Sequence, residues 1–208
     1  MKKQLVLAVA LLTTTSFLQA QSVIGNFEGS SLDGWSAGSG TTLSFATVGA
    51  TLGSSSLKIV APGNDNNVLN FMNGMSYQSQ LAQAESISLD ITAQNDDGSI
   101  PSWWVQNQIS LNSDTTGWIG LSGDNGTSIG WGPQTTHETY AISSTVAAQL
   151  ASASWIQIFL TDNTGSDGAT IYVDNIAINA APVPEPGTMA VVAMGGAALL
   201  FFRRRTGR

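Results

Sequence analysis

The sequence has no cysteine and a single histidine among its 208 residues. The absence of cysteine excludes disulfides, thiol redox chemistry and zinc sites built from thiolates. Any catalytic triad would depend on His137 alone, and a zinc site with one His and no Cys would be carboxylate-heavy and unusual. We therefore expect His137 to be a solvent-facing loop or strand residue.

Positive charge is nearly missing from the middle of the chain. Of the seven Lys and Arg residues only Lys58 lies outside the two ends, whereas every acid except Glu185 lies between them. Nucleic-acid binding needs a basic footprint, so this strongly acidic stretch argues against that function. It is compatible with neutral glycans and divalent cations, although solubility outside the cell explains the acidity most simply.

The N-terminus has the three parts of a secretory signal peptide. Lys2-Lys3 are followed by an apolar stretch, Leu5 to Leu12, and Leu18-Gln19-Ala20 offers a cleavage site before Gln21. This order of a basic start, an apolar core and a cleavage site is typical of export signals. We predict that residues 1–20 are a signal peptide and that the chain is exported.

The C-terminus has a second ordered set of parts. Val183-Pro184-Glu185-Pro186 precedes an apolar stretch, residues 187–202, and Arg203-Arg204-Arg205 follow it. Prolines end strand pairing, so the folded domain should stop before them. The stretch has about 16 residues, just short of the roughly 17–25 of a transmembrane helix. Arginines behind it would stay on the cytoplasmic side of the membrane.

This tail, Val183 to Arg208, resembles the PEP-CTERM sorting signal of Gram-negative bacteria in its box, apolar segment and terminal arginine cluster. The resemblance implies recognition by an exosortase, a membrane-embedded transpeptidase-like protease. The chain would be held transiently at the inner membrane through residues 187–202 and cut near the box. It would then be released or attached at the cell surface. The alternative is an ordinary single-pass anchor.

The stretch between the two ends, residues 22–181, is long enough for one domain with a full core. Short alternating runs separated by Gly, Asn, Asp and Ser clusters predict an all-β sandwich or barrel. Two short helices are expected at Thr145–Ala153 and Ser79–Glu85. The predicted strands are Val23–Glu28, Thr41–Thr47, Ser56–Val60, Val68–Met72, Ser86–Ala93, Trp103–Leu111, Gly117–Leu121, Thr139–Ile142, Ser154–Thr161 and Thr170–Ile178.

The tryptophans are the best candidates for ligand chemistry, because indoles stack on the apolar faces of sugars while amide side chains bond the hydroxyls. Strand alternation places Trp and Gln residues together on polar faces. The glycan-binding candidates are Trp104, Gln106, Gln108, Trp118, Trp155 and Gln157. The competing interpretation is that these tryptophans only pack in the core or at strand edges. Asn107 has the opposite parity and would need a partner if buried.

Short motifs at both ends of the domain form a second resemblance. Asn26-Phe27-Glu28-Gly29, Leu32-Asp33-Gly34-Trp35, Ser56-Leu57-Lys58-Ile59 and Ile171-Tyr172-Val173-Asp174-Asn175-Ile176 occur in this order. The set is similar to the galactose-binding-like jelly rolls, especially xylan- and glucan-binding carbohydrate-binding modules. The resemblance implies an antiparallel jelly-roll β-sandwich with its terminal strands side by side. It also implies a structural Ca²⁺ held by Glu28, the backbone oxygen of Lys58 and Asp174.

These observations predict an exported cell-surface or biofilm-matrix protein whose domain binds extracellular polysaccharide without catalysis. One alternative is a structural surface protein that binds no small ligand. A glycoside hydrolase is a further alternative, because that reaction needs only two carboxylates, such as Glu28 with Glu138.

Overall fold

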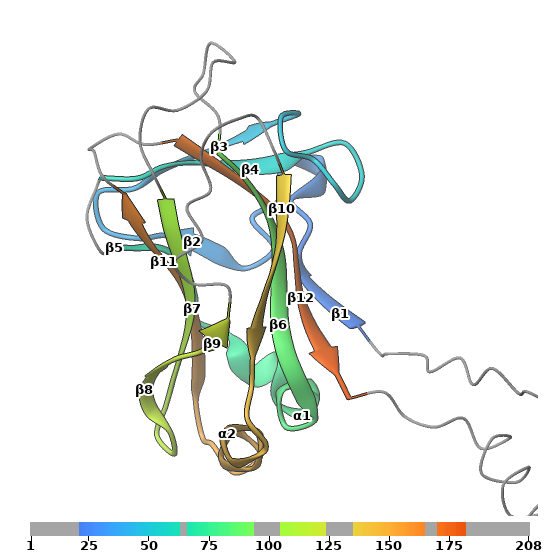
Figure 1. Cartoon of the computed structure of the whole chain (residues 1–208), viewed down its shortest axis with the longest axis vertical. Helices are drawn as coiled ribbons and strands as arrows, with labels where there is room; N and C mark the ends of the chain where they lie inside the picture. The colour runs from blue at the N-terminus through green and yellow to red at the C-terminus, as the bar shows by residue number, and fades with distance from the viewer. Residues whose placement is uncertain (1–20, 63–65, 94–104, 124–134, 165–169, 182–208) are drawn as a thin grey trace, which may run out of the picture. The chain divides into compact units, whose positions relative to one another are not determined.

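The computed structural model describes residues 21–62, 66–93, 105–123, 135–164 and 170–181 (Figure 1). These ranges belong to one compact unit, Ala20–Ala181. The hydrophobic core that the described residues form lies within this unit, so the unit carries its own core. The predicted signal peptide, the predicted transmembrane segment at 187–202 and the sorting residues lie outside the described ranges.

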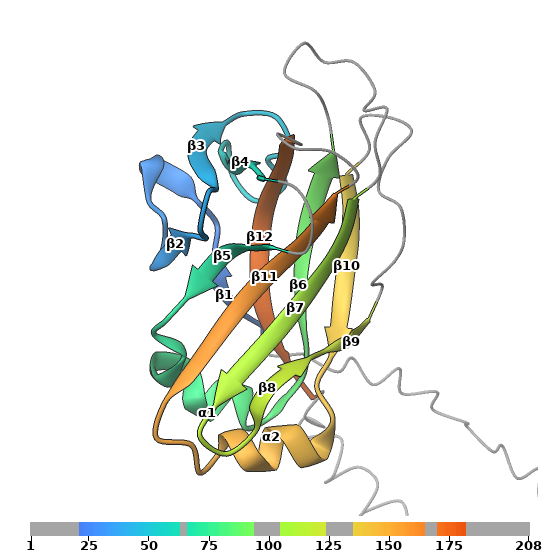
Figure 2. The ribbon, with the colours of Figure 1, turned by 90° about the vertical axis from the view of Figure 1, so that its left-hand side faces the viewer.

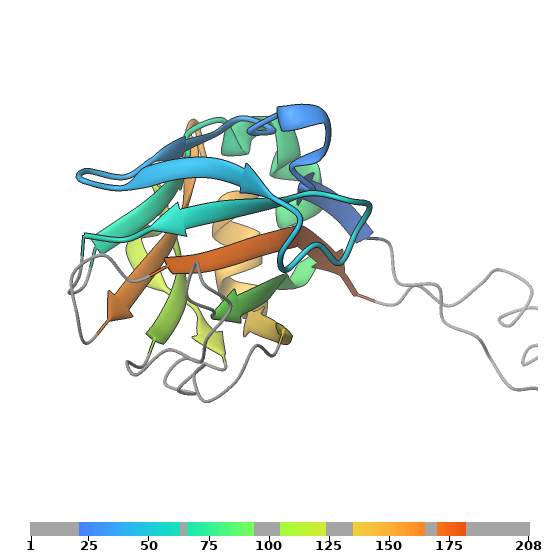
Figure 3. The ribbon, with the colours of Figure 1, turned by 90° about the horizontal axis from the view of Figure 1, so that it is seen from above.

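The larger of two antiparallel sheets has seven strands. In spatial order its main path runs β3 (Thr42–Ala46), β4 (Ser56–Val60), β12 (Thr170–Ala180), β6 (Ala84–Ala93), β10 (Thr135–Ala141) and β9 (Ser122–Gly123). The first strand, β1 (Gln21–Gly25), pairs with the last strand, β12, with Gln21 opposite Asn179. The terminal strands therefore lie side by side, as the resemblance implies (Figures 1 and 3).

The smaller sheet has five strands. Their order is β2 (Trp35–Ala37), β5 (Asn66–Phe71), β11 (Ile156–Thr164), β7 (Val105–Ser113) and β8 (Gly117–Gly120). Figure 2 shows β11 and β7 crossing in front of β6, β10 and β12 of the other sheet. The two sheets thus form the layers of a sandwich, and the predicted all-β fold is confirmed.

Period-2 alternation decides which side chains fill the space between the sheets. In β6 the residues Ile87, Leu89 and Ile91 are fully buried in the core. In β11 the set Ile156, Ile158 and Leu160 does the same from the opposite sheet. The predicted inward faces of these two strands are therefore confirmed.

Three short helices lie together at one end of the sandwich: η2 (Gly74–Tyr77), α1 (Gln78–Leu81) and α2 (Ser144–Leu150) (Figure 2). A fourth, η1 (Glu28–Ser30), lies elsewhere, where Glu28 contacts the segment between β3 and β4. The Ser143 side chain caps α2 by accepting the backbone N–H of Val146, which satisfies one free donor of the first turn. Within the described ranges, no helix has both the length and the apolar character needed to cross a membrane.

The structure adds two strands that the sequence pattern did not predict, β2 and β9, of three and two residues. Such short runs hold too few residues to show alternation. Strand β10 begins at Thr135 rather than at the expected Thr139. The expected Ser79–Glu85 helix is only the single turn of α1, and β6 begins at Ala84.

Candidate functional site

The outer face of the five-stranded sheet carries a continuous set of uncharged polar side chains. The strand register places Asn112 of β7 between Trp118 of β8 and Gln157 of β11. Alternation then assigns further residues of these strands to the same side. We call this surface the amide face; it comprises Asn70, Gln106, Gln108, Asn112, Gln157 and Asn163, together with the rings of Trp118 and Phe159.

Two aromatic rings give the amide face an apolar edge. The centroids of Trp118 and Phe159 lie 4.5 Å apart with the rings tilted by 37°. Phe159 is buried beneath this contact, whereas 51% of Trp118 remains exposed. The indole is therefore supported by another ring from below and open to solvent, which is the arrangement that a stacking ligand requires.

Amide side chains on neighbouring strands bond to each other across this face. Asn112 Nδ2 donates to Gln157 Oε1, and Asn163 Nδ2 donates to Gln106 Oε1, both at 3.3 Å. A Cβ on Gly120 would approach the amide of Gln108 to 2.4 Å, so the glycine gives the Gln108 side chain room to lie flat. The pairs fix the amide orientations and leave each side chain further donor or acceptor capacity.

Charge is missing from the amide face. Among the described residues of these strands, none on the outer side is Asp, Glu, Lys, Arg or His. Asp162 of β11 alternates inward instead and is buried. The face can therefore bond hydroxyl groups, but it offers no ion pair to a charged ligand.

Trp155 lies immediately before β11, two residues from Gln157, and 40% of it is exposed. The preceding residue is held by Asp114, whose carboxylate accepts the Ser154 backbone N–H at 2.9 Å. Hydrogen bonds from the Ser154 side chain and backbone lower the pKa of Asp114. Trp104, the remaining tryptophan candidate, lies outside the described residues.

The structure thus brings Gln106, Gln108, Trp118 and Gln157 to one face, although the sequence pattern suggested separate strand faces. It adds Asn112 and Asn163, which share the parity of the predicted residues and could have been found by extending the alternation. The contact between Trp118 and Phe159 could not have been predicted from the alternation, because it depends on β8 and β11 lying on either side of β7.

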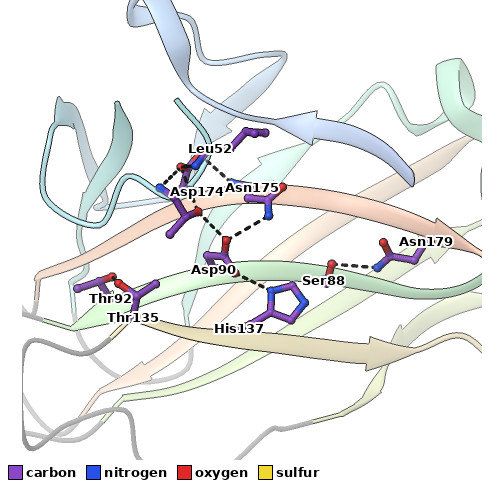
Figure 4. A network of polar contacts seen from close by, with 10 residues as sticks. Leu52, Ser88, Asp90, Thr92, Thr135, His137, Asp174, Asn175 and Asn179 are labelled. Atoms are coloured by element: carbon purple, nitrogen blue, oxygen red, sulfur yellow. Dashed lines mark hydrogen bonds and ion pairs between the residues drawn. The ribbon is translucent and has the colours of Figure 1, made fainter. Parts of the chain in front are cut away.

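The three residues of the predicted calcium site have other partners. Asp174 Oδ2 accepts the backbone N–H groups of Thr51 (2.7 Å) and Leu52 (2.8 Å) (Figure 4). Glu28 Oε1 accepts the N–H groups of Ser54 (2.8 Å) and Ser55 (2.6 Å). These backbone hydrogen bonds lower the pKa of Glu28. Both acids therefore fasten the segment between β3 and β4, which we call the 51–55 loop.

This geometry does not fit a cation shared by the two acids. Their oxygens face N–H and O–H donors, whose positive ends would repel a metal ion, whereas Ca²⁺ needs about six to eight oxygen ligands. Lys58 lies in the middle of β4, in register with both Ser44 and Tyr172, so its backbone oxygen belongs to the sheet. Among the described residues, no group of three or more acids or histidines could hold a metal. Whether an ion binds here remains an untested prediction.

His137 lies on the outer face of the seven-stranded sheet, with 55% of its side chain exposed. Its Nδ1 is 2.6 Å from Asp90 Oδ1, and Asp90 Oδ2 accepts hydrogen bonds from Asn175 Nδ2 and Thr51 Oγ1 (Figure 4). The solvent-facing position expected for the histidine is confirmed. Asp90 links it to the 51–55 loop, which the sequence did not indicate.

The described geometry offers no support for hydrolysis. Ser36 has the spacing of a nucleophile elbow, Gly34-Trp35-Ser36-Ala37-Gly38, but it lies in β2 and its Oγ donates to the Asn70 backbone oxygen. It belongs to the opposite sheet from His137. A second stretch of this spacing, residues 126–130, lies outside the described ranges. The predicted carboxylate pair is not assembled either, because Glu138 points into the core while Glu28 bonds the 51–55 loop.

Known proteins resemble the C-terminal tail and the sandwich of this chain separately. Residues 182–205 match the PEP-CTERM protein-sorting motif. The chain carries that sorting signal. The match includes the Val-Pro-Glu-Pro box at 183–186 and the arginines at 203–205, and the motif indicates export and membrane-associated sorting to the cell surface. No curated protein matches this chain.

Solved structures are similar in fold to the sandwich of this chain. The CBM27-1 of Caldicellulosiruptor saccharolyticus, in complex with mannohexaose, has a TM-score of 0.53 and 14% identity, covering 76% of this chain and 96% of that one. The CBM22-2 xylan-binding domain of Paenibacillus barcinonensis Xyn10C has a TM-score of 0.51 and 17% identity, covering 76% and 97%. The sandwich therefore has the jelly-roll fold of carbohydrate-binding modules, as predicted.

Proposed function

We propose that this is a cell-surface or matrix protein whose sandwich binds a neutral polysaccharide on the amide face, without catalysis. The single observation that supports the proposal most is the solvent-open Trp118 ring, backed by Phe159 and bordered by amide side chains. An indole of this kind stacks on the C–H face of a sugar, and oriented amides bond its hydroxyl groups.

The charge pattern supports a neutral ligand rather than an acidic one. The amide face has no charged residue among those described, and the protein around it is acidic. An acidic polysaccharide would be repelled by that field and would find no cation on the face to pair with. Neutral xylan- or mannan-type chains meet no such barrier.

The sorting signal supports glycan binding at the cell surface. We infer that an exosortase cuts the tail near Val183–Pro186 after the apolar segment has held the chain at the inner membrane. The binding domain would then be released or attached at the surface, where extracellular polysaccharide is found. A structural surface protein without a small ligand is the second candidate, and the same experiment separates the two.

The test is affinity electrophoresis of the Ala20–Ala181 unit in gels containing xylan, mannan, a neutral glucan or an acidic polysaccharide. Retardation in at least one neutral gel and none in the acidic gel is the expected result. Trp118→Ala should abolish the retardation. Phe45→Ala, which removes an exposed aromatic ring from β3 of the other sheet, is the matched control and should not.

Circular dichroism of both variants checks that they fold. Absence of retardation in every gel by a folded unit would reject glycan binding and favour the structural role. Retardation that survives Trp118→Ala but not Phe45→Ala would place the site on the other sheet.

A further inference from the structure

Three polar side chains point into the core between the two sheets. Glu138 comes from β10, Asp162 from β11 and Asn107 from β7. Their exposed fractions are 1%, 1% and 2%. Each alternates inward with core residues: Glu138 is opposite Leu89, and Asp162 is opposite Asn107 in the ladder.

Within this interior cluster the contacts of Asp162 and Asn107 are incomplete. Tyr140 donates its O–H to Glu138 Oε2 at 2.5 Å. Neither oxygen of Asp162 has a hydrogen-bond partner, and neither end of the Asn107 amide has one. Asp162 and Asn107 are cross-strand neighbours, yet they do not bond each other. Buried polar groups are nearly always paired, so four orphaned atoms at one place indicate a missing ligand.

Among the described residues, no Lys, Arg or His side chain points toward Asp162 or Asn107. Lys58 is the only Lys or Arg between the two ends of the chain, and it alternates with the buried Leu57 and Ile59, so it lies on the outer side of its sheet. His137 also lies outside, against Asp90. Burying the Asp162 carboxylate close to the charge of Glu138 is costly.

That cost affects the protonation of Asp162. Burial, with a further contribution from the charge of Glu138, raises the pKa of Asp162 to about 7. A single proton on Asp162 would relieve the repulsion between the two acids. One proton supplies a single O–H donor, whereas two atoms of Asn107 and two of Asp162 lack partners, so protonation explains only part of the cluster.

We propose that Asp162, Glu138 and the amide oxygen of Asn107 bind a Ca²⁺ ion between the two sheets. Carboxylate and amide oxygens are the ligands that this hard cation prefers, and its flexible coordination tolerates side chains from three strands. Mg²⁺ fits less well, because it gives up its water reluctantly and demands octahedral geometry. Water completing the shell would accept the Asn107 N–H₂.

The ion would link β10 of one sheet to β7 and β11 of the other. It is separate from the Glu28 and Asp174 positions, whose oxygens hold the 51–55 loop. The proposal also does not depend on glycan binding, since the cluster faces inward and the amide face outward.

The test is the melting temperature of the Ala20–Ala181 unit in EDTA and across a CaCl₂ titration, with the affinity measured by calorimetry. Calcium at a hundredfold excess over its Kd should raise the melting temperature of the wild type by about 5–10 °C. Asp162→Asn should weaken binding at least tenfold. In EDTA the same variant should melt at a higher temperature than the wild type, because it removes a buried charge. In saturating calcium the wild type should have the higher melting temperature of the two.

Two further variants keep the test decisive. Glu138→Gln removes the other carboxylate and should also lose the calcium response, which covers the case in which Asp162→Asn does not fold. Asp114→Asn removes a surface charge and should respond like the wild type. A wild type indifferent to calcium, with Asp162→Asn more stable in both conditions, would show a shared proton instead. A response that disappears only with Glu28→Gln or Asp174→Asn would place the ion at the loop and overturn the proposal.

Discussion

Asp174→Ala should destabilise the domain strongly, and by the same amount with and without calcium. The fully buried Asp174 carboxylate accepts three backbone N–H groups, those of Thr51, Leu52 and Asn175, at 2.7–2.8 Å. Each orphaned buried donor costs about 1–3 kcal/mol. Because the loop is only partly buried and can regain water, we expect the low end of the sum, about 3 kcal/mol in the free energy of unfolding.

The assay is urea unfolding of the Ala20–Ala181 unit followed by tryptophan fluorescence, in EDTA and in CaCl₂. Asp174→Asn is the matched control, since its amide oxygen can still accept the N–H groups of Thr51 and Leu52, and it should lose less than half as much. A loss for Asp174→Ala confined to the calcium samples would refute the hydrogen-bond reasoning. It would instead support the calcium site implied by the resemblance.

Three other outcomes follow from the geometry. Trp118→Ala should weaken glycan affinity by about 2 kcal/mol, or thirtyfold, without changing the urea midpoint; isothermal calorimetry measures it, and an unchanged Kd would contradict the stacking role. Gly38→Ala would place a Cβ 1.4 Å from the Asn67 backbone oxygen, so we expect a loss of about 2–3 kcal/mol in urea unfolding, and wild-type stability would show that β2 can shift. Because its hydrogen bonds from Ser154 lower the folded pKa of Asp114, the ionised form stabilises the domain above about pH 4, and this contribution is lost as the pH falls through the folded pKa. Asp114→Asn should therefore flatten the acid side of a plot of melting temperature against pH, and a parallel curve would argue against the contact.

The sandwich was predictable because its long strands alternate cleanly. In β6 and β11 one parity is mainly Ile and Leu, and in β12 the run Thr170–Ile178 is rich in β-branched residues. Hydrophobic burial between two sheets requires that pattern, so the sequence shows it directly. The two-residue strand β9 is held by a neighbour, β10, rather than by its own composition. Such an element has no local signal.

The candidate site was only partly predictable, since a face depends on which strands are neighbours. The parity of Gln106 and Gln108 shows that they point together, but not that Trp118 and Gln157 join them from β8 and β11. The acids show the same limit: Glu28 and Asp174 stand out in the motifs, yet their partners belong to a loop more than twenty residues from either. The need of Asn107 for a partner was foreseeable, whereas its position opposite Asp162 follows from the register alone.

The position of the last strand has a mechanical consequence. Strand β12 pairs with β1, β4 and β6 and ends at Ala180, two residues before the sorting motif begins. Any pull exerted through an attached tail would enter the domain along this strand and load the hydrogen bonds of all three ladders in shear. Bonds stretched together in this way resist more force than bonds opened one after another. If the domain binds polysaccharide as proposed, a fluid flow that drags on that polysaccharide would strain β12, which pairs with three strands, and not a strand at the edge of a sheet.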